Sequence, residues 1–151
     1  MARFIFKLES ILSIKEKLET QAKVEFGIEM ARLREEEEKL EAMRLRKEEF
    51  QRRLTGAVQN QLNIRQIKDL EDAVENVKYN MRLQRVVIRE QEARVELARE
   101  KMNEAMKERK TYERLKEKAF EEFLKELDKA ERKEVDELVS FRYQNAVESE
   151  D

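Results

Sequence analysis

The stretch from Ile67 to Met102 reads IKDLEDAVENVKYNMRLQRVVIREQEARVELAREKM, and its apolar residues recur every seven positions. One row of this repeat comprises Ile67, Val74, Met81, Ile88, Val95 and Met102. The companion row comprises Leu70, Val77, Gln84, Gln91, Ala98, Ala105 and Tyr112. A seven-residue repeat sustained over this length is typical of a coiled-coil helix. We therefore expect the two rows to form the inward-facing side of a long helix, called the seam below.

The same repeat continues less strictly toward the C-terminus. It runs through Leu115, Ala119, Phe123, Leu127, Ala130, Leu138 and Phe141. The pattern predicts one helix from about residue 65 to about residue 145, roughly 120 Å long at 1.5 Å per residue.

The composition favours long helices over the whole chain. Of the 151 residues, 45% are charged and 40% are hydrophobic, whereas about 25% are charged in an ordinary globular domain. Such a chain has too little apolar surface for a compact layered core. It contains no proline and two glycines, so almost nothing interrupts a helix. The sequence predicts an all-α protein.

The residues before position 60 keep a register of their own. One row comprises Ile5, Leu12, Glu19, Phe26, Leu33, Leu40, Lys47 and Leu54. The other comprises Leu8, Lys15, Ala22, Glu29, Glu36, Met43, Phe50, Ala57 and Ile64. The seam formed by these rows is apolar at both ends and more polar between about Lys15 and Glu36, which predicts looser packing or a local shift of the repeat there.

The segment 55–63 is the best candidate for a turn. Gly56 suits the end of a helix in the left-handed conformation, and Asn63 can cap the next helix. We predict one domain, residues 1–151, that folds as a two-helix antiparallel coiled-coil hairpin. Helix 1 would span about 4–56, the turn 57–64 and helix 2 about 65–145. With the turn near residue 60, Phe4 would lie near residue 116, and the last 30 or so residues would overhang helix 1.

The sequence lacks the groups that most enzymes and metal sites require. It contains no histidine and no cysteine, and its two glycines lie far apart, so no phosphate-binding loop is present. Consecutive glutamates such as Glu35–Glu38 point in different directions on a helix and cannot converge on one cation. Only triads of the Ser/Lys kind remain open. We expect no catalytic residue, no cofactor and no metal.

The charge balance and hydropathy bear on partners and location. A net charge of −2 argues against nucleic acid as the partner, unless a basic stripe is present. No apolar run approaches the roughly 18 residues of a membrane span, and charge interrupts the N-terminal apolar residues too soon for a signal peptide. We expect a cytoplasmic protein that is a monomeric hairpin when free.

Two apolar clusters exceed what one seam needs. Phe4, Phe6, Leu8, Ile11 and Leu12 crowd the N-terminus, and Phe120, Phe123, Leu124 and Leu127 cover more than one helix face. The N-terminal cluster either folds onto the overhanging helix or forms an exposed docking site. The apolar surface of the overhanging helix should need a partner or a cavity to shield it.

Both ends of the chain resemble the FliJ family of the bacterial flagellar export apparatus. The opening residues 4–9 (FIFKLE), followed by Ile11, Leu12, residues 15–19 (KEKLE) and Ala22, look like the start of these proteins. Residues 112–118 (YERLKEK) and 131–138 (ERKEVDEL), with Arg142, are similar to their C-terminal block. The resemblance covers the whole chain.

The resemblance implies a function as well as a fold. FliJ proteins are antiparallel coiled coils, similar to the γ stalk of rotary ATPases. They bind the hexameric flagellar export ATPase, promote its ring assembly and activity, contact the membrane export gate, and escort export chaperones. By this analogy the chain would associate peripherally with the inner-membrane export apparatus at the flagellar base.

The resemblance also nominates binding residues. The open end would contact the ATPase through Phe4, Phe6, Leu8, Phe120, Phe123, Leu127 and Leu138. The region near the hairpin tip would contact the export gate through Met43, Phe50, Leu70, Ala73 and Val77, although Met43, Phe50, Leu70 and Val77 also fit the seam rows. Two rival classes stay open: a structural coiled coil, such as a stalk subunit of another ATPase or a cytoskeletal spacer, and a nucleic-acid-binding coiled coil.

Overall fold

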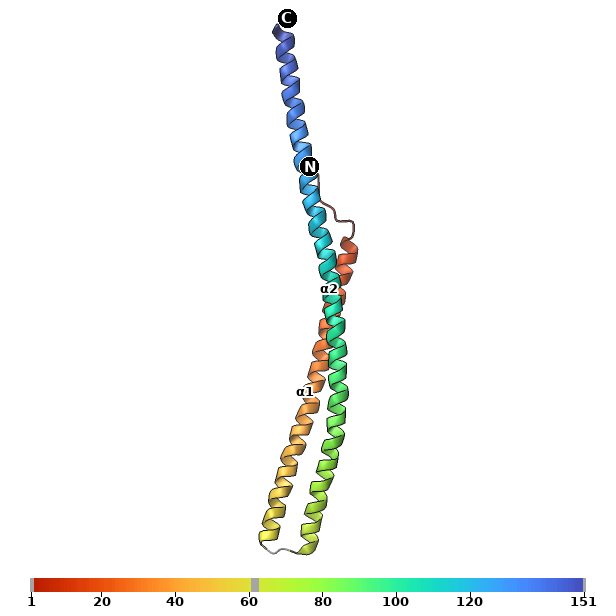
Figure 1. The fold of residues 1–151 in the computed structure, drawn as a ribbon, viewed down its shortest axis with the longest axis vertical. Helices are drawn as coiled ribbons and strands as arrows, with labels where there is room; N and C mark the ends of the chain where they lie inside the picture. Colours follow the sequence, from red (N-terminus) through yellow and green to blue (C-terminus); the bar gives the residue numbers. More distant parts are fainter. Residues whose placement is uncertain (1, 61–62, 151) are drawn as a thin grey trace. The chain divides into compact units, whose positions relative to one another are not determined.

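The chain forms two long α-helices that pack against each other as an antiparallel hairpin (Figure 1). The structure is a computed structural model that describes residues 2–60 and 63–150. Helix α1 spans Glu9–Gln59 and helix α2 spans Ile64–Glu150. The described residues contain no strand, and the predicted all-α hairpin is confirmed.

Two compact units make up the chain. One is Thr20–Glu104, here called the tip unit, and the other combines Met1–Glu19 with Ala105–Asp151, here called the open-end unit. Both helices contribute to both units. The assignment of the whole chain to one domain stays a prediction.

The N-terminus differs from the prediction, because α1 begins at Glu9 and not near residue 4. Residues 2–6 are not helical, and the helix opens where the Leu12 amide donates to the Leu8 carbonyl at 2.9 Å. Aromatic and β-branched residues have only modest helix propensity, and Phe4 instead packs its ring on α2. The contact with α2 therefore outweighs one more turn of helix.

The turn also differs in part from the prediction. The expectation that Gly56 ends the first helix is wrong, because α1 continues to Gln59 and the Asn60 amide donates to the Gly56 carbonyl at 3.0 Å. The predicted cap at Asn63 is confirmed, since its side-chain oxygen accepts from the Arg65 amide at 3.1 Å. Positions 61 and 62 of the predicted turn lie outside the described residues.

The seam of the tip unit is the predicted seven-residue repeat. On α2 the buried side chains are those of Val74, Val77, Met81, Gln84, Ile88, Gln91, Val95 and Ala98, which alternate three and four residues apart. The side chains between them are exposed or half-buried. The α1 rows face inward as well, since every row position from Phe26 to Ala57 is buried or half-buried. Burial of these rows along the seam holds the unit together, as the seven-residue repeat of a coiled coil requires.

Two polar layers interrupt this apolar seam. The Gln84 amide donates to the backbone carbonyl of Glu36 at 2.9 Å and to its carboxylate at 2.6 Å. One heptad further along α2, Gln91 repeats both bonds with Glu29, at 3.0 and 2.6 Å. Both pairs are symmetric about position 60, as a hairpin turn there requires. The polar stretch of α1 is thus hydrogen-bonded, and a shift in register would break both layers together.

The Glu36 layer makes stability depend on pH. The hydrogen bond from Gln84, followed by the nearby Lys39 ammonium, lowers the pKa of Glu36 below its ordinary value. A carboxyl whose pKa is lower in the folded state stabilises the fold above its unfolded pKa, and this contribution disappears as the pH falls through the folded pKa.

We expect Glu36→Gln to be less stable than the wild type at neutral pH, with the difference shrinking as the pH falls from about 7 to about 3. Urea unfolding followed by circular dichroism across this range measures it. Glu38→Gln, at an exposed position on the same helix, is the matched control and should track the wild type. A wild type and Glu36→Gln that differ equally at every pH would contradict the assignment.

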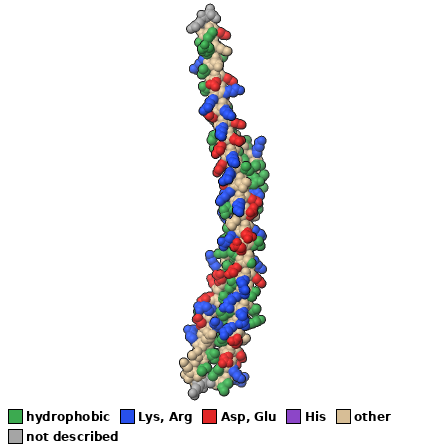
Figure 2. Space-filling view, viewed as in Figure 1, with side chains coloured by type: hydrophobic (Ala, Val, Ile, Leu, Met, Phe, Trp, Pro, Cys, Tyr) green, Lys and Arg blue, Asp and Glu red, His purple; other side chains and the backbone are tan. Residues whose placement is uncertain are grey.

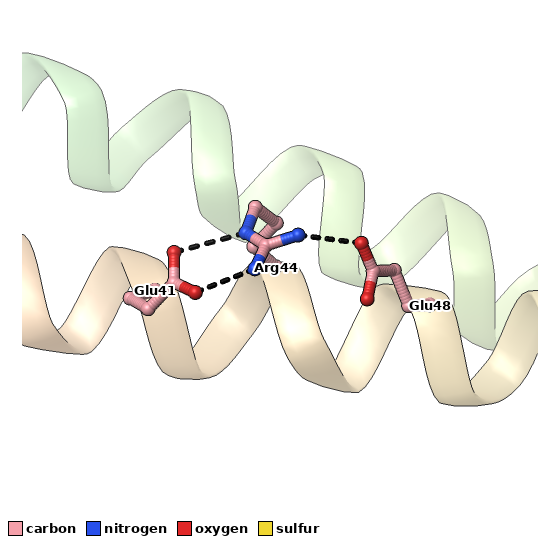
Figure 3. A network of polar contacts seen from close by, with 3 residues as sticks. All are labelled: Glu41, Arg44 and Glu48. Atoms are coloured by element: carbon pink, nitrogen blue, oxygen red, sulfur yellow. Dashed lines mark hydrogen bonds and ion pairs between the residues drawn. The ribbon is translucent and has the colours of Figure 1, made fainter.

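On the face shown in Figure 2, acidic and basic side chains are interspersed with hydrophobic ones. On α1, Arg44 donates to Glu41 at 2.6 and 2.9 Å and to Glu48 at 2.5 Å (Figure 3). These carboxylates, Glu41 above all, raise the pKa of Arg44, and Arg44 lowers the pKa of Glu41. Exposed pairs of this kind add little stability, so burial in the seam decides the fold.

Candidate docking surfaces

An aromatic cluster holds the N-terminal segment against α2 in the open-end unit. The ring centroid of Phe4 lies 5.2 Å from that of Phe120, edge to face at 72°, and 5.5 Å from that of Phe123. Phe120 and Phe123 stack at 6.4 Å. Such pairs stabilise by about 1 kcal/mol beyond the area they bury. The sequence left two alternatives for the N-terminal apolar cluster, folding onto the second helix or an exposed docking site. Phe4 follows the first, because its ring packs on α2.

Phe4 meets α2 further along than the predicted position near residue 116. Its ring partners are Phe120 and Phe123. The reason is that residues 2–6 are not helical, and a non-helical chain covers up to about 3.3 Å per residue, compared with 1.5 Å in a helix.

The cluster borders an open groove of about 750 Å³. Phe6 and Leu8 line it from the N-terminal segment, and Leu115, Ala119 and Phe123 line it from α2. Phe4, Phe6, Leu8, Phe123 and Leu127 are half-buried. Phe120 and Leu138 are exposed, at 44% and 59%. Six of the seven nominated ATPase-contact residues thus lie within a short stretch of the unit, and Leu138 lies further along the overhang.

Ion pairs join α1 to α2 within the open-end unit. Lys15 pairs with Glu108 at 2.8 Å, and Lys116 pairs with Glu9 at 2.9 Å. The buried carboxylate of Glu19 pairs closely with Arg109.

Ion pairing shifts the pKa values of two of these cations. Glu108 raises the pKa of Lys15, and Glu113 and Glu19 raise the pKa of Arg109. Both shifts favour the charged forms of Lys15 and Arg109.

The C-terminal part of α2 is the overhang that the sequence predicted. Every side chain described from Asp128 to Ser149 is exposed. It includes apolar residues that ordinarily seek cover: Val135, Leu138, Val139, Phe141, Tyr143 and Val147. A helix with this much exposed apolar surface is typical of an interaction site.

The nominated gate-contact residues lie in the seam of the tip unit. Met43, Phe50, Leu70 and Ala73 are half-buried, and Val77 is only 6% exposed. Of the two placements that the sequence left open for Val77, the seam is the observed one. The guanidinium carbons of Arg46 and Arg53 lie over the Phe50 ring, 5.6 and 6.0 Å from its centroid, so two cations accompany this ring.

The described residues offer little else that carries chemistry. They contain no group of three or more acidic side chains placed to hold a metal ion. No helix among them is both long enough and apolar enough to cross a membrane. The sequence did not predict a candidate surface on the outward face of α2 between residues 78 and 89, because the seven-residue repeat identifies only inward-facing positions.

The fold and these surfaces define a coiled-coil hairpin with an apolar, uncovered helix end. The family model described as flagellar FliJ protein matches residues 4–148, and the chain belongs to the FliJ family. That family is a non-catalytic component of flagellar protein export, as the resemblance of both chain ends predicted. No curated protein and no solved structure matches the chain significantly.

Proposed function

We propose that the chain is a stalk and escort protein of flagellar export, which binds the hexameric export ATPase, promotes its ring assembly and activity, and links it to the export gate and to export chaperones. Family membership supports the export assignment. The observation that carries the finer proposal is the uncovered apolar overhang of α2 beside the Phe4–Phe120–Phe123 cluster.

The ATPase would bind this open end. Phe4, Phe6 and Leu8 form one side of a groove, and Phe123 and Leu127 continue along α2 toward Leu138. A hexameric ring would bury the exposed part of this surface. Binding can change the activity of the ring only if the stalk prefers one ring conformation over the others. The stalk itself then needs no catalytic group.

The export gate would bind the tip unit. Met43, Phe50, Leu70 and Ala73 keep part of their surface accessible, whereas Val77 could take part only by supporting its neighbours. The Arg46 and Arg53 cations beside Phe50 suit an acidic or aromatic partner surface. Chaperone escort and a peripheral position at the inner membrane complete the proposal, and family membership supports both.

The first test is steady-state ATP hydrolysis by the export ATPase of the same organism, with and without about one copy of this chain per hexamer. We expect the rate to rise at that ratio and the two proteins to co-migrate on a sizing column. An unchanged rate without co-migration would remove the stalk proposal and leave a coiled coil of another complex.

A further inference from the structure

The outward face of α2 carries a basic stripe in the tip unit. Between residues 78 and 89 the sequence has four basic residues and no acidic residue. Lys78 pairs with Glu75 at 3.4 Å, but Arg82, Arg85 and Arg89 are exposed and form no ion pair within the described residues. Figure 2 shows Lys and Arg side chains gathered over the part of α2 nearer the turn.

An apolar ridge accompanies this basic stripe. Tyr79, Leu83 and Val87 lie four residues apart and are 55%, 49% and 40% exposed. Val86 lies beside them at 45%. These positions point away from the seam, where a hairpin that stands alone ordinarily carries charged residues. Apolar residues four apart form the ridges that pack into the grooves of another helix.

The overhang of α2 carries a complementary stripe in the open-end unit. Between residues 134 and 148 there are four acidic residues and one basic residue. Val135, Val139 and Tyr143 lie four residues apart, with Leu138 beside them, and these four side chains are 57%, 61%, 72% and 59% exposed. The acidic side chains here form no ion pair within the described part of the chain.

The two stripes match in sequence as well as in charge. Arg82 and Arg85 each come one residue before an exposed apolar residue, namely Leu83 and Val86. Glu134 and Glu137 likewise precede Val135 and Leu138. One residue is about 100° around a helix, so the charged flank lies on the same side of the ridge in both stripes. When two such helices pack ridge to ridge and antiparallel, their charged flanks lie next to each other. When they pack parallel, the two charged flanks lie on opposite sides of the contact.

We propose that the basic stripe of one chain binds the acidic overhang of a second copy, with the two α2 segments antiparallel. This places Arg82 and Arg85 beside Glu134 and Glu137, and ridge against ridge. The inference goes beyond the proposed function and does not depend on it. It gives the uncovered overhang an occupant in the absence of other partners.

A helix fits the basic stripe better than a broad anionic surface does. The bond between Gln84 and Glu36 sets the run Glu35–Glu38 of α1 at the level of the stripe. The side chains of Glu35, Glu37 and Glu38 are exposed. A lipid bilayer or a nucleic acid that meets the stripe broadly would also approach these carboxylates, whereas one helix covers the stripe alone.

The test is sedimentation equilibrium of the full chain and of two charge-reversed variants. The wild type should dimerise with a Kd below about 100 µM at about 0.1 M salt, and this Kd should rise at least about tenfold at 1 M salt, where the Debye length falls to about 3 Å. The variants R82E/R85E and E134R/E137R should each be monomeric, because like charges then meet.

An equimolar mixture of the two variants should dimerise again, since each reversed stripe meets its opposite. Both variants alter exposed side chains, and circular dichroism should show unchanged helicity. A wild type that stays monomeric at about 100 µM, or a mixture that stays monomeric, overturns the proposal. A monomeric wild type that binds phosphatidylglycerol vesicles, with loss of binding in R82E/R85E, would reassign the stripe to a lipid surface.

Discussion

Deleting residues 113–151 is expected to abolish activation of the export ATPase, while residues 20–104 keep their helical hairpin. The deletion removes Phe120, Phe123, Leu127 and Leu138 together, and it leaves Phe4 without its ring partners. The tip unit has its own buried seam, from Val74 to Ala98 on α2, and does not use the deleted residues. Loss of function should therefore come without loss of that seam.

The measurement is ATP hydrolysis against stalk concentration, with circular dichroism to verify helicity. A shorter deletion, of residues 128–151, keeps the aromatic cluster and removes the exposed overhang with Leu138. We expect the concentration of this variant needed for half-maximal activation to rise at least about tenfold, which corresponds to a loss of about 1.4 kcal/mol in binding. Leu45→Ser, at a position 51% exposed in the tip unit, is the control and should activate fully.

Full activation by the chain that lacks residues 113–151 would contradict the role of the open end. A binding assay separates the remaining outcomes. If this deletion still co-migrates with the ATPase but does not activate it, the overhang acts on ring conformation and the ring is held elsewhere on the chain.

The sequence was sufficient to predict the seam of the tip unit, because burial there follows one simple period. Val74, Met81 and Gln84 are buried where the seven-residue repeat places them, and the repeat is long enough to average out single exceptions. The polar residues Glu29 and Glu36 fit the same register. Their hydrogen bonds to Gln91 and Gln84 required the partner helix to be in place, so composition alone predicted only a looser seam.

The helix ends were harder to predict, because small local preferences compete with packing there. Glycine inside a helix costs about 1 kcal/mol relative to alanine, which favoured an end at Gly56. The helix continues because Ala57, only 2% exposed, is buried in the seam one residue later. At the N-terminus, the contact of Phe4 with Phe120 and Phe123 is distant in sequence and invisible to local propensity.

The candidate sites also include residues that the sequence could place and residues that it could not. Phe4, Phe120 and Phe123 were selected as apolar surplus beyond one seam, and they do meet in the structure. Residues such as Met43 and Val77 were nominated by the family resemblance and also fit the seam rows, and only the packed hairpin shows their side chains turned inward. Their contribution to gate binding stays a prediction.

Replacing Met81 by alanine should destabilise the hairpin by about 2–4 kcal/mol, the largest effect expected of a single truncation here. Met81 is 4% exposed in the seam of the tip unit, between Val77 and Gln84 of the companion row. Truncation removes apolar contact and leaves a cavity that two regular helices cannot close without moving. In a protein with no layered core, each seam residue carries a large share of the total stability.

Leu97→Ala is the matched control, since it also shortens an apolar side chain on α2 within the same unit. Leu97 is 53% exposed, and alanine has the higher helix propensity, so the change should stay within about 0.5 kcal/mol. Guanidinium unfolding of both variants, followed by circular dichroism, compares them directly when the free energy of unfolding has the same dependence on denaturant concentration in both. Both changes raise helix propensity, so equal losses for the two variants would mean that burial in the seam does not distinguish the two positions. That result would also remove the physical basis for treating the outward faces as surfaces free to bind.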